Sequence, residues 1–502
     1  MNYMPDYKGG VSQYHQALPS LPPNNQSFFP NPPIIKVMGF KEDIREIACE
    51  LRAHESVTII SHIDADGISG EAILSQALSR AGIRVTSVFV RQIEPLTIRQ
   101  VPKDDTFKLF CDLGAGQQNL IAETGFGNDE VGIIDHHVSQ PCEIEYLQAN
   151  CLPYGHTKLS AAGVAYLVAK EIDSGNTDLA SLAVIGNVGD MMAREDCGLT
   201  GIAKEIAYEG AAHGSVDIRK RDLNCYGIST RPLHICLSYN DDPFIPGISN
   251  NAGGALRFLQ KLGIPLQDDL QRWLVWEEFT CEDQRIISSA LAQQLLVHGG
   301  SITRLFCESY LFPAERERTP LRNAQEYATL LNACGRWSRP KIGGQICRGD
   351  RGSAYREAEH MLTNHRTIIR ELLQFILDSG VTELSHLQYI HVGNRYPDTI
   401  VGIGAGMALS KLNREKPILI MVEQPEDPSL TKVSLRATEQ MLSRGVDLQV
   451  AATAASERFG GAGGGHRIAA GAFIPRESEH EFIQHVNELL AGQCTKKGTG
   501  HR

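Results

Sequence analysis

The chain has 502 residues, of which 42% are hydrophobic and 21% are charged, and its net charge is −11. This length exceeds what one ordinary hydrophobic core needs, so we expect two or three domains of a globular protein. The acidic balance excludes a surface covered with basic groups for DNA, but it is compatible with a local basic channel. The sequence contains no apolar run of the roughly 18 to 20 residues that a membrane span requires, and we expect no membrane contact.

The two ends of the chain and its cysteines indicate the cellular compartment that we expect. Residues 1–36 are rich in Pro, Asn, Gln and Ser and lack the order of a secretion signal, which favours a flexible tail. Residues 493–502 are expected to form a second, loose tail. The 12 cysteines are scattered without a C-x-x-C pair, which counts against a zinc ribbon or disulfide framework and favours a reducing cytoplasm.

Residues 37–200 alternate short apolar runs with amphipathic stretches. The runs SVTII, VTSVFV, KLFCDL and VGIIDHH are typical of buried strands, and SGEAILSQALSRAG between two of them is typical of a helix. Further helical patterns occupy 160–172 and 178–192. This alternation predicts an α/β domain with an open, mostly parallel sheet and helices on both faces, whose ligands bind beyond the carboxyl ends of the strands.

The remainder of the chain divides into two regions. Residues 201–380 are mainly helical, with long helix candidates near 281–298 and 356–379. Residues 381–492 return to strand-like runs, at QYIHVG, DTIVGI, KPILIMV, KVSLRAT and AAGAFIP, and close with a helix at 479–491. We therefore expect a mainly helical middle region followed by a second, smaller α/β domain.

Four motifs carry acidic and imidazole groups, and three of them end a predicted strand. Their potential ligands are His62, Asp64 and Asp66 in HIDADG, Asp112 in CDLG, Asp135, His136 and His137 in DHH, and Asp190 in GNVGDMM. Taken singly, an Asp after a strand is most often a turn former or helix cap, and one His of DHH is also compatible with a hydrogen-bonded core imidazole. Gathered at one sheet edge, the carboxylates would raise one another's pKa and destabilise the fold unless cations neutralised them. Mixed carboxylate and imidazole ligands suit Mn²⁺ or Mg²⁺, and there are enough for two ions about 3.5–4 Å apart.

The order of these motifs, D-x-D-G, D, DHH and D, resembles the DHH phosphoesterase superfamily. The segment NVGDMM, together with SAAGVAYL, narrows the resemblance to RecJ-type exonucleases. FGGAGGGHRIAAGAF at 459–473 resembles the glycine-rich signature of the DHH-associated C-terminal domain. The helical middle region and the lack of an obvious OB module are more similar to the archaeal RecJ-like branch.

The resemblance implies roles for individual residues. It makes Asp64, Asp66, Asp112, His136 and Asp190 metal ligands, with Asp112 bridging two ions. His62 joins this set, although its position varies between branches of the superfamily. His137 would face the scissile phosphate, and Asp135 would orient the imidazoles, as carboxylates behind a metal site often do.

The glycine-rich segment of the second domain suits phosphate binding. Without side chains, Gly463, Gly464 and Gly465 allow backbone N–H groups to approach a ligand, and His466 adds a donor. Ser434 and Arg436 in VSLRAT would clamp a phosphate beside them. The alternative is a flexible interdomain loop. Gly402, Gly404 and Gly406 mimic a dinucleotide fingerprint, but we interpret them as a structural strand-to-helix turn.

Residues 316–356 form a basic cluster, with Tyr327, Trp337 and Tyr355 interleaved. Its nine cations are Arg316, Arg318, Arg322, Arg336, Arg339, Lys341, Arg348, Arg351 and Arg356. The pattern suits a path for unpaired bases, and the alternatives are a solvated helical face or a docking face for a protein partner.

The combined hypothesis is an exonuclease that hydrolyses terminal phosphodiesters of single-stranded DNA or RNA in replication or repair. The implied cofactor is Mn²⁺ (or Mg²⁺), with two ions per site. One alternative is a phosphodiesterase for small substrates, such as nano-oligonucleotides or cyclic dinucleotides. Another is a replisome scaffold bound to a partner such as GINS.

Overall fold

The computed structural model describes residues 39–94, 97–424 and 427–495, with residues 494 and 495 described by their backbone alone. The tail expected at 1–36 and residues 496–502 of the second expected tail lie outside this described part. Among the described residues, no helix is both long enough and apolar enough to cross a membrane.

The first domain is built on a five-stranded sheet whose order is β2-β1-β3-β4-β5, with every neighbouring pair parallel. The bounds are β1 Ser56–His62, β2 Arg84–Val90, β3 Phe107–Cys111, β4 Val131–Asp135 and β5 Leu147–Asn150. The predicted parallel sheet is confirmed. The short strand β5 was not predicted, because LQAN carries only two apolar residues.

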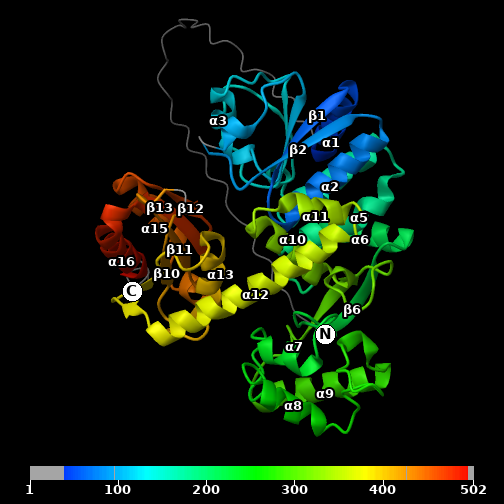
Figure 1. Cartoon of the computed structure of the whole chain (residues 1–502), viewed down its shortest axis with the longest axis vertical. Coiled ribbons are helices and arrows are strands. Elements are labelled where there is room, and N and C mark those ends of the chain that lie inside the picture. Colours follow the sequence, from blue (N-terminus) through cyan, green and yellow to red (C-terminus); the bar gives the residue numbers. More distant parts are fainter. Residues whose placement is uncertain (1–38, 95–96, 425–426, 496–502) are drawn as a thin grey trace, which may run out of the picture. The chain divides into compact units, whose positions relative to one another are not determined.

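Both faces of this sheet are buried, because alternate residues of each strand enter two different cores. Ile59 of β1 and Leu109 of β3 pack into one core, with helices α1 (Phe40–Ala53), α2 (Ala65–Arg80) and α4 (Ala161–Ile172). Ile60 and Phe110, one position further along, enter the other core beside α3 (Gln118–Glu123). Figure 1 shows α1 and α2 beside the strands β1 and β2.

The order of the strands reverses at β1. The chain passes from β1 to β2 on one side and returns to β3 on the other, so that β1 is flanked by both. A crevice opens beyond the carboxyl ends of the strands at such a reversal. The residues that follow β1 and β3 therefore meet in one place.

The middle region contains a small core of its own, with Leu237, Leu259 and Leu291 at its centre. The elements that contribute to it are β6 Asp217–Leu223, α7 Leu233–Tyr239, α8 Ala252–Gln260, α9 Cys281–Val297 and β7 Phe306–Leu311. Helices α5 Ala180–Gly189 and α6 Gly201–His213, which precede them, bury side chains in the core of the first domain. The predicted helix near 281–298 corresponds to α9. Strands β6 and β7 form an antiparallel pair that the helical expectation missed, since the charged sequence DIRKRDL has little strand-like alternation.

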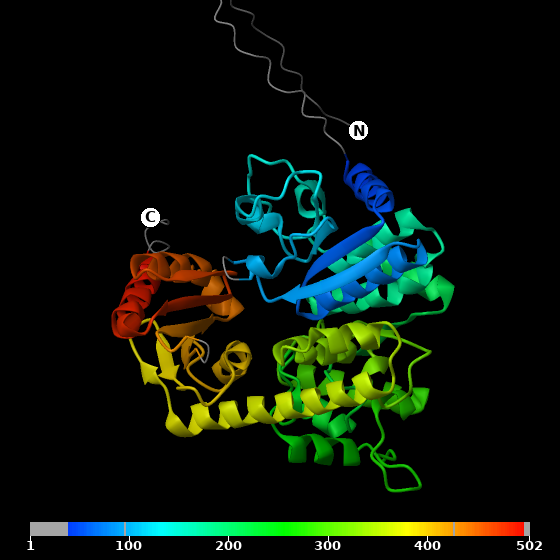
Figure 2. The same ribbon diagram turned by 45° about the horizontal axis from the view of Figure 1, so that its top comes forward.

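Three further helices of this region are α10 (Ala324–Arg336), α11 (Pro340–Cys347) and the long α12 (Ser353–Ser379), which is yellow in Figures 1 and 2. Helices α10 and α11 and the first half of α12 bury side chains in the core of the first domain. The second half of α12 contributes Leu372 and Ile376 to a separate core at the C-terminal end of the chain. The region 201–380 is thus shared between several packing units.

The C-terminal domain holds a six-stranded mixed sheet of order β12-β13-β11-β10-β9-β8, in which only β9 and β10 pair in parallel. Its strands are β8 Thr382–Glu383, β9 Gln388–His391, β10 Ile418–Glu423, β11 Leu430–Arg436, β12 Ala462–Gly465 and β13 Ala469–Pro475. Its helices are α13 Asp398–Leu409, α14 Glu439–Ser443, α15 Leu448–Arg458 and α16 Glu479–Thr495. The predicted α/β architecture of the whole chain is confirmed.

Three expectations in this domain are wrong. The run DTIVGI lies in helix α13 rather than in a strand, and Gly402, Gly404 and Gly406 lie inside the same helix rather than at a turn. The apolar run buries Val401, Ala405 and Ala408 at helical spacing, which a six-residue window cannot distinguish from a strand. Helix α16 also continues to Thr495, so residues 493–495 are helical and not part of a loose tail.

Helix α10 crosses the turn between β1 and α2 at very close range. A Cβ atom placed on Gly335 would lie 1.8 Å from the carbonyl oxygen of Ile63. The side-chain oxygen of Asn332, one turn earlier, accepts a hydrogen bond from the backbone N–H of Ala65 at 2.9 Å. The turn after β1 is therefore held by a helix some 270 residues later in the chain.

We predict that Gly335→Ala destabilises the protein by about 1–3 kcal/mol or more, because the added methyl group forces α10 away from the turn. Gly406→Ala is the matched control, since this helical glycine is exposed and has open space around its Cβ position. It should stabilise by about 0.5–1 kcal/mol. Chemical denaturation of both variants measures the difference, and equal shifts of the same sign would contradict the close approach.

Candidate active site

The site begins at the turn between β1 and α2. His62 is the last residue of β1, and Asp64 caps α2 by accepting a hydrogen bond from the N–H of Gly67 at 3.0 Å. A Cβ atom on Gly67 would lie 2.4 Å from the carbonyl oxygen of His62, so only glycine allows the helix to begin this close to the strand. The HIDADG motif therefore owes its compactness to this glycine.

Asp66, in the first turn of α2, joins this helix to α4. Its two carboxylate oxygens accept hydrogen bonds from the backbone N–H groups of Ala161 at 2.8 Å and Ala162 at 3.0 Å. These donors lie at the N-terminus of α4, where the helix dipole also favours a negative charge. The serine-bearing SAAG segment is thus positioned by a carboxylate of the site.

Asp112 follows β3 in a left-handed backbone conformation, with a φ of 61°. Its N–H group donates to the carbonyl oxygen of Ile134 at 2.9 Å, which ties it to the neighbouring strand. A residue other than glycine adopts this conformation only where its surroundings enforce it, and such positions cluster at functional sites. Asp112 Oδ2 lies 3.3 Å from His62 Nδ1, so the ends of β1 and β3 meet as the strand order requires.

Asp135 ends β4 and holds the two histidines that follow it. Its Oδ1 atom accepts hydrogen bonds from the backbone N–H groups of His136 at 2.8 Å and His137 at 3.2 Å, and it lies 2.7 Å from His137 Nδ1. Its Oδ2 atom accepts from the N–H of Ala115 at 3.0 Å. Burial would raise the pKa of Asp135, but these partners, His137 first, lower it overall. The Asp135 hydrogen bond in turn raises the pKa of His137.

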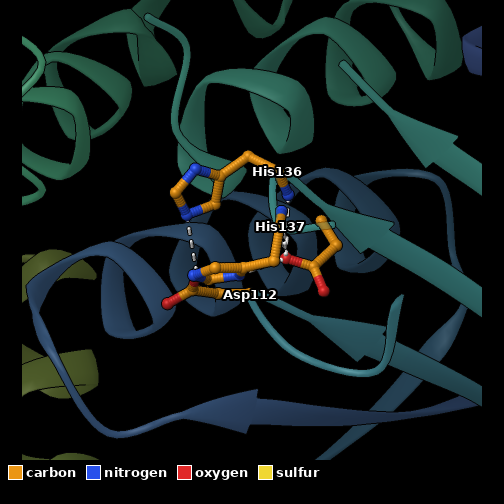
Figure 3. A group of neighbouring side chains, drawn as sticks. Asp112, His136 and His137 are labelled. Atoms are coloured by element: carbon orange, nitrogen blue, oxygen red, sulfur yellow. Dashed lines mark hydrogen bonds and ion pairs between the residues drawn. The ribbon is translucent and has the colours of Figure 1, made fainter. Parts of the chain in front are cut away.

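The imidazole of His136 points into a ring of carboxylates. Its Nε2 atom lies 3.4 Å from Asp112 Oδ1, 3.4 Å from Asp190 Oδ2 and 3.9 Å from Asp66 Oδ2. This nitrogen is buried and has no hydrogen-bond partner among the described residues. Figure 3 shows the His136 ring directed toward Asp112, with His137 beside it.

The acidic and imidazole groups form three overlapping sets, each with its ligand atoms within 4.8 Å of one another. The first set is His62, Asp64 and Asp112, the second is Asp66, His136 and Asp190, and the third is Asp112, Asp135, His136 and His137. The contact between Asp112 and His136 joins them. The structure therefore brings together all eight residues of the four motifs, and an unpartnered imidazole nitrogen facing three carboxylates fits a divalent cation.

Burial and mutual repulsion perturb the pKa values of this cluster. Burial raises the pKa of Asp66, raises that of Asp112 well above its usual range and raises that of Asp190 to about 8, with neighbouring carboxylates adding to each shift. Burial also acts against charge on His62, yet Asp64 and Asp112 raise its pKa well above the usual value. Asp64 moves the other way, because His62 outweighs the effect of burial and lowers its pKa. The metal-free cluster thus retains protons that a cation would replace.

The expected phosphate clamp lies in the C-terminal sheet. Gly464 of β12 pairs with Gly471 of β13, and Gly471 pairs on its other side with Ser434 of β11. The glycine-rich segment is therefore a strand at the sheet edge rather than a flexible loop. Arg436 ends β11 largely buried, and no carboxylate of a described residue lies within ion-pair distance of it. Its guanidinium donates to the carbonyl oxygen of Leu435 at 2.8 Å.

The basic cluster at 316–356 is mostly neutralised. Five of its nine cations form ion pairs, namely Arg318 with Glu278, Arg322 with Glu277, Arg339 with Glu357, Arg348 with Glu71 and Arg351 with Glu315. Tyr327 is buried, and Trp337 donates its indole N–H to the carbonyl oxygen of Met361. All five acidic partners lie outside residues 316–356, so the sequence of this segment does not reveal that these cations are paired. An open basic path along this segment is therefore not what the fold presents.

The contribution of α10 to the site is not evident from the sequence. Asn332 carries no metal-ligand signal, and Arg336 was noticed only as a member of the basic cluster. In the structure Asn332 supports the turn after β1, and the charge of the Asp64 carboxylate acts on the buried Arg336 guanidinium. Burial lowers the pKa of Arg336 to about 10. The only available signal is the spacing of Asn332 and Arg336. They are four residues apart, so a helix through this segment places both on one face.

Comparison with known proteins agrees with this architecture. Three family models match the chain: the DHH family N-terminal domain at residues 56–187, the DHH-CID domain at 225–305 and the DHHA1 domain at 386–492. An uncharacterized protein of Methanocaldococcus jannaschii is 26% identical over 452 residues, which cover 88% of this chain and 94% of that protein.

Solved structures share the fold at low sequence identity. RecJ of Thermus thermophilus in complex with Mn²⁺ has a TM-score of 0.56 and 15% identity over 92% of this chain, which spans only 56% of that protein. An exonuclease RecJ bound to manganese has a TM-score of 0.51 and 15% identity, covering 91% of this chain and 95% of its own. CDC45 from Entamoeba histolytica has a TM-score of 0.62 and 13% identity, covering 90% and 99%.

The three matched domains and the constellation at the end of the parallel sheet define a DHH phosphoesterase, and the chain belongs to this family. Within the family, its architecture is of the RecJ type.

The metal-free protein should lose stability as the pH rises. The pKa values of Asp66, Asp112 and Asp190 are raised in the folded state, so the folded protein binds more protons than the unfolded chain above about pH 4, and the free energy of unfolding falls through this window. His62 and His137 act in the same sense, because their pKa values are also raised. The lowered pKa values of Asp64 and Asp135 affect stability only below about pH 4. We expect the melting temperature in EDTA to fall between about pH 5 and 8. Saturating Mn²⁺ should raise it more at the higher pH, because a cation competes with these protons.

Thermal unfolding at several pH values measures this dependence. Asp190→Asn should show a smaller decline, since it removes the group whose pKa is raised to about 8. A metal-free protein that gains stability across the whole window would contradict the proton-sharing cluster.

Proposed function

We propose that this protein is a metal-dependent exonuclease of the cytoplasm, which hydrolyses terminal phosphodiesters of single-stranded DNA or RNA in replication or repair. The observation that carries this proposal is the pair of ligand sets, His62, Asp64 and Asp112 beside Asp66, His136 and Asp190, joined through Asp112 and His136. Two adjacent sites rich in carboxylates are the arrangement that phosphodiester hydrolysis with two metal ions uses.

In this proposal each of these two sets would hold one Mn²⁺ or Mg²⁺ ion, and Asp112, which contacts His136, would lie close to both. Ions bound there supply a Lewis acid for the phosphoryl oxygens and a water of lowered pKa. Asp135 fixes the His137 ring through Nδ1 and raises its pKa, which leaves Nε2 as a donor for charge that develops on a phosphoryl oxygen. Asp135 is thus a positioning residue, and His137 is the group that would touch the substrate.

The C-terminal sheet would bind the strand. Arg436 is a largely buried cation that lacks an acidic partner among the described residues, and such a charge favours an anionic ligand. Ser434 lies on the same strand, and Gly463, Gly464, Gly465 and His466 offer backbone and imidazole donors nearby in the sheet. A phosphate of the substrate is the ligand that this donor set suits.

A scaffold function, with a partner such as GINS, is the second candidate. The similarity in fold to CDC45 supports it. The energetic cost of the acidic cluster counts against a scaffold. Burial raises the pKa values of Asp112 and Asp190, and such buried carboxylates weaken the fold. A protein that needs no cation gains nothing from them. A small-substrate phosphodiesterase shares the same metal chemistry and differs in the length of strand that it prefers.

Hydrolysis should depend on Asp112. Removing a residue that supports a metal ligand typically costs about 10- to 100-fold. We therefore expect Asp112→Asn, which removes a ligand of the first set that also contacts His136 of the second, to lose about 100-fold or more of the activity. Asp105→Asn is the matched control, because this exposed carboxylate precedes β3, whereas Asp112 follows the other end of the same strand. Digestion of single-stranded DNA and RNA, labelled at either end, with Mn²⁺ or Mg²⁺, provides the measurement. Turnover near the wild-type rate in Asp112→Asn would refute the metal-dependent mechanism.

Arg436 should affect strand capture more than metal binding. Arg436→Ala removes the proposed phosphate contact, and we expect the Kd for a single strand to rise by about 10-fold, in line with a charge-assisted hydrogen bond of roughly 1.5–3 kcal/mol. The stabilisation by Mn²⁺ should stay as in the wild type. Arg414→Ala, an exposed arginine of the same domain, is the control. An unchanged Kd in Arg436→Ala would remove this residue from the substrate site.

A further inference from the structure

A polar pocket of about 500 Å³ lies beside the Asp190 segment. Gly189 and Met191, on either side of Asp190 in sequence, form one wall, and α10 forms another through Asn332 and Arg336. The third wall comes from the middle region, between residues 223 and 242. The volume falls within the roughly 300–1,000 Å³ of pockets that bind small ligands.

One side of this pocket carries an unpaired cation. The Arg336 guanidinium has His365 as its hydrogen-bonding partner, with Nη1 at 3.0 Å from Nε2. Burial and the nearby arginines lower the pKa of His365 to about 4, so this imidazole is neutral at physiological pH and accepts the hydrogen bond. No carboxylate of a described residue lies within ion-pair distance of Arg336. A buried guanidinium without a counter-ion favours an anion such as a phosphate.

The lining also contains aromatic and apolar surface. The Arg231 guanidinium lies over the rings of Tyr226 and Tyr239, at 4.9 and 5.3 Å from their centres. These cation–π contacts hold Tyr239 in place, although 63% of this residue is exposed. Met191 is 60% exposed and has a left-handed backbone, with a φ of 61°. Exposed aromatic rings held in this way are suited to stacking with nucleobases.

Two side-chain amides of the lining offer free hydrogen-bond donors, in a pocket whose other polar groups include Asp241, Asp242 and Glu308. The Asn240 Nδ2 atom is buried and has no hydrogen-bond partner among the described residues. Asn332 uses its oxygen to accept from Ala65, so that its NH₂ group remains as a donor. Buried donors without acceptors cost free energy, and a ligand rich in acceptor atoms would relieve that cost. Nucleobases, sugars and phosphates are rich in such atoms.

We propose that this pocket binds one nucleotide of the single-stranded substrate. The phosphate lies toward Arg336, the base rests against Tyr239 and Met191, and Asn240 and Asn332 donate to its acceptor atoms. The inference rests on the proposed exonuclease function and extends it, because it assigns a nucleotide subsite to the middle region of the chain. The DHH-CID segment then contributes to substrate binding as well as to the fold.

Tyr239 allows a clean test, because it is exposed, whereas replacement of the buried Arg336 would affect folding as much as binding. The full chain is kept in EDTA, so that no hydrolysis occurs, and the Kd is measured for a labelled single strand of about 12 nucleotides, within the range of single-strand sites. Tyr239→Ala should weaken binding by about 5- to 150-fold, the loss expected for one stacked base. Tyr239→Phe keeps the ring and should bind like the wild type. Tyr208→Ala removes an exposed tyrosine of α6, whose ring lies beneath the Lys204 ammonium, and should also leave the Kd unchanged.

A strand with a single abasic position, moved along its length, identifies the base that enters the pocket. At one position the wild type should lose as much affinity as Tyr239→Ala loses with the intact strand. At that position Tyr239→Ala should lose nothing further, because both changes remove the same contact. Equal binding of wild type and Tyr239→Ala overturns the proposal, and so does a loss that is additive at every position.

Hydrolysis is measured separately with Mn²⁺, which keeps the two proposals apart. Binding that depends on Tyr239, in a protein that hydrolyses no strand, would support the pocket and refute the exonuclease. If the wild type hydrolyses a strand, but wild type and Tyr239→Ala bind the strand equally well, the exonuclease is supported and the pocket is refuted. A wild type that binds no strand in EDTA overturns the pocket.

Discussion

Five carboxylates and three imidazoles meet at one end of the parallel sheet, and the repulsion among the carboxylate charges constrains the structure around them. Backbone N–H groups at fixed positions donate hydrogen bonds to some of these carboxylates. Asp66 accepts the first N–H groups of α4, and Asp135 accepts three backbone N–H groups, two from the histidines that follow it and one from Ala115. Each of these bonds offsets part of the cost of burying a charge. Asp112 and Asp190 lack comparable donors among the described hydrogen bonds, and burial raises the pKa of both. The cation that we propose would complete the neutralisation there.

Helix α10 connects this crevice to the rest of the chain. Its Gly335 fits against the turn after β1, Asn332 binds the backbone of that turn, and Arg336 faces the neighbouring pocket. One rigid helix therefore supports the ligand-bearing turn and lines the proposed nucleotide subsite. Such an arrangement suits a hydrolase, because a reacting phosphate must be positioned to within a fraction of an ångström relative to the catalytic groups.

The metal-site candidates could be predicted from local patterns. HIDADG, CDLG and DHH each follow an apolar run, and parallel strands bring their carboxyl ends to one edge, so their convergence followed from the strand pattern alone. The ion pairs of the basic cluster could not be predicted from local patterns. Its arginines pair with Glu71, Glu277 and Glu278, which are distant in sequence, and no local window contains both partners. DTIVGI was mistaken for a strand because six apolar residues satisfy a strand and a buried helix equally.

By itself, the sequence determined the parallel α/β first domain, the strand-end positions of the acidic and imidazole groups, and the smaller α/β domain that follows. These features depend on hydrophobic periodicity and on residue types next to one another in the chain. Only the tertiary structure decided which charges are paired, that Asn332 and Arg336 belong beside the site, and that residues 223–242 close a pocket next to Asp190. These depend on contacts between segments far apart in the chain, where the free energy comes from packing and burial rather than from local preference.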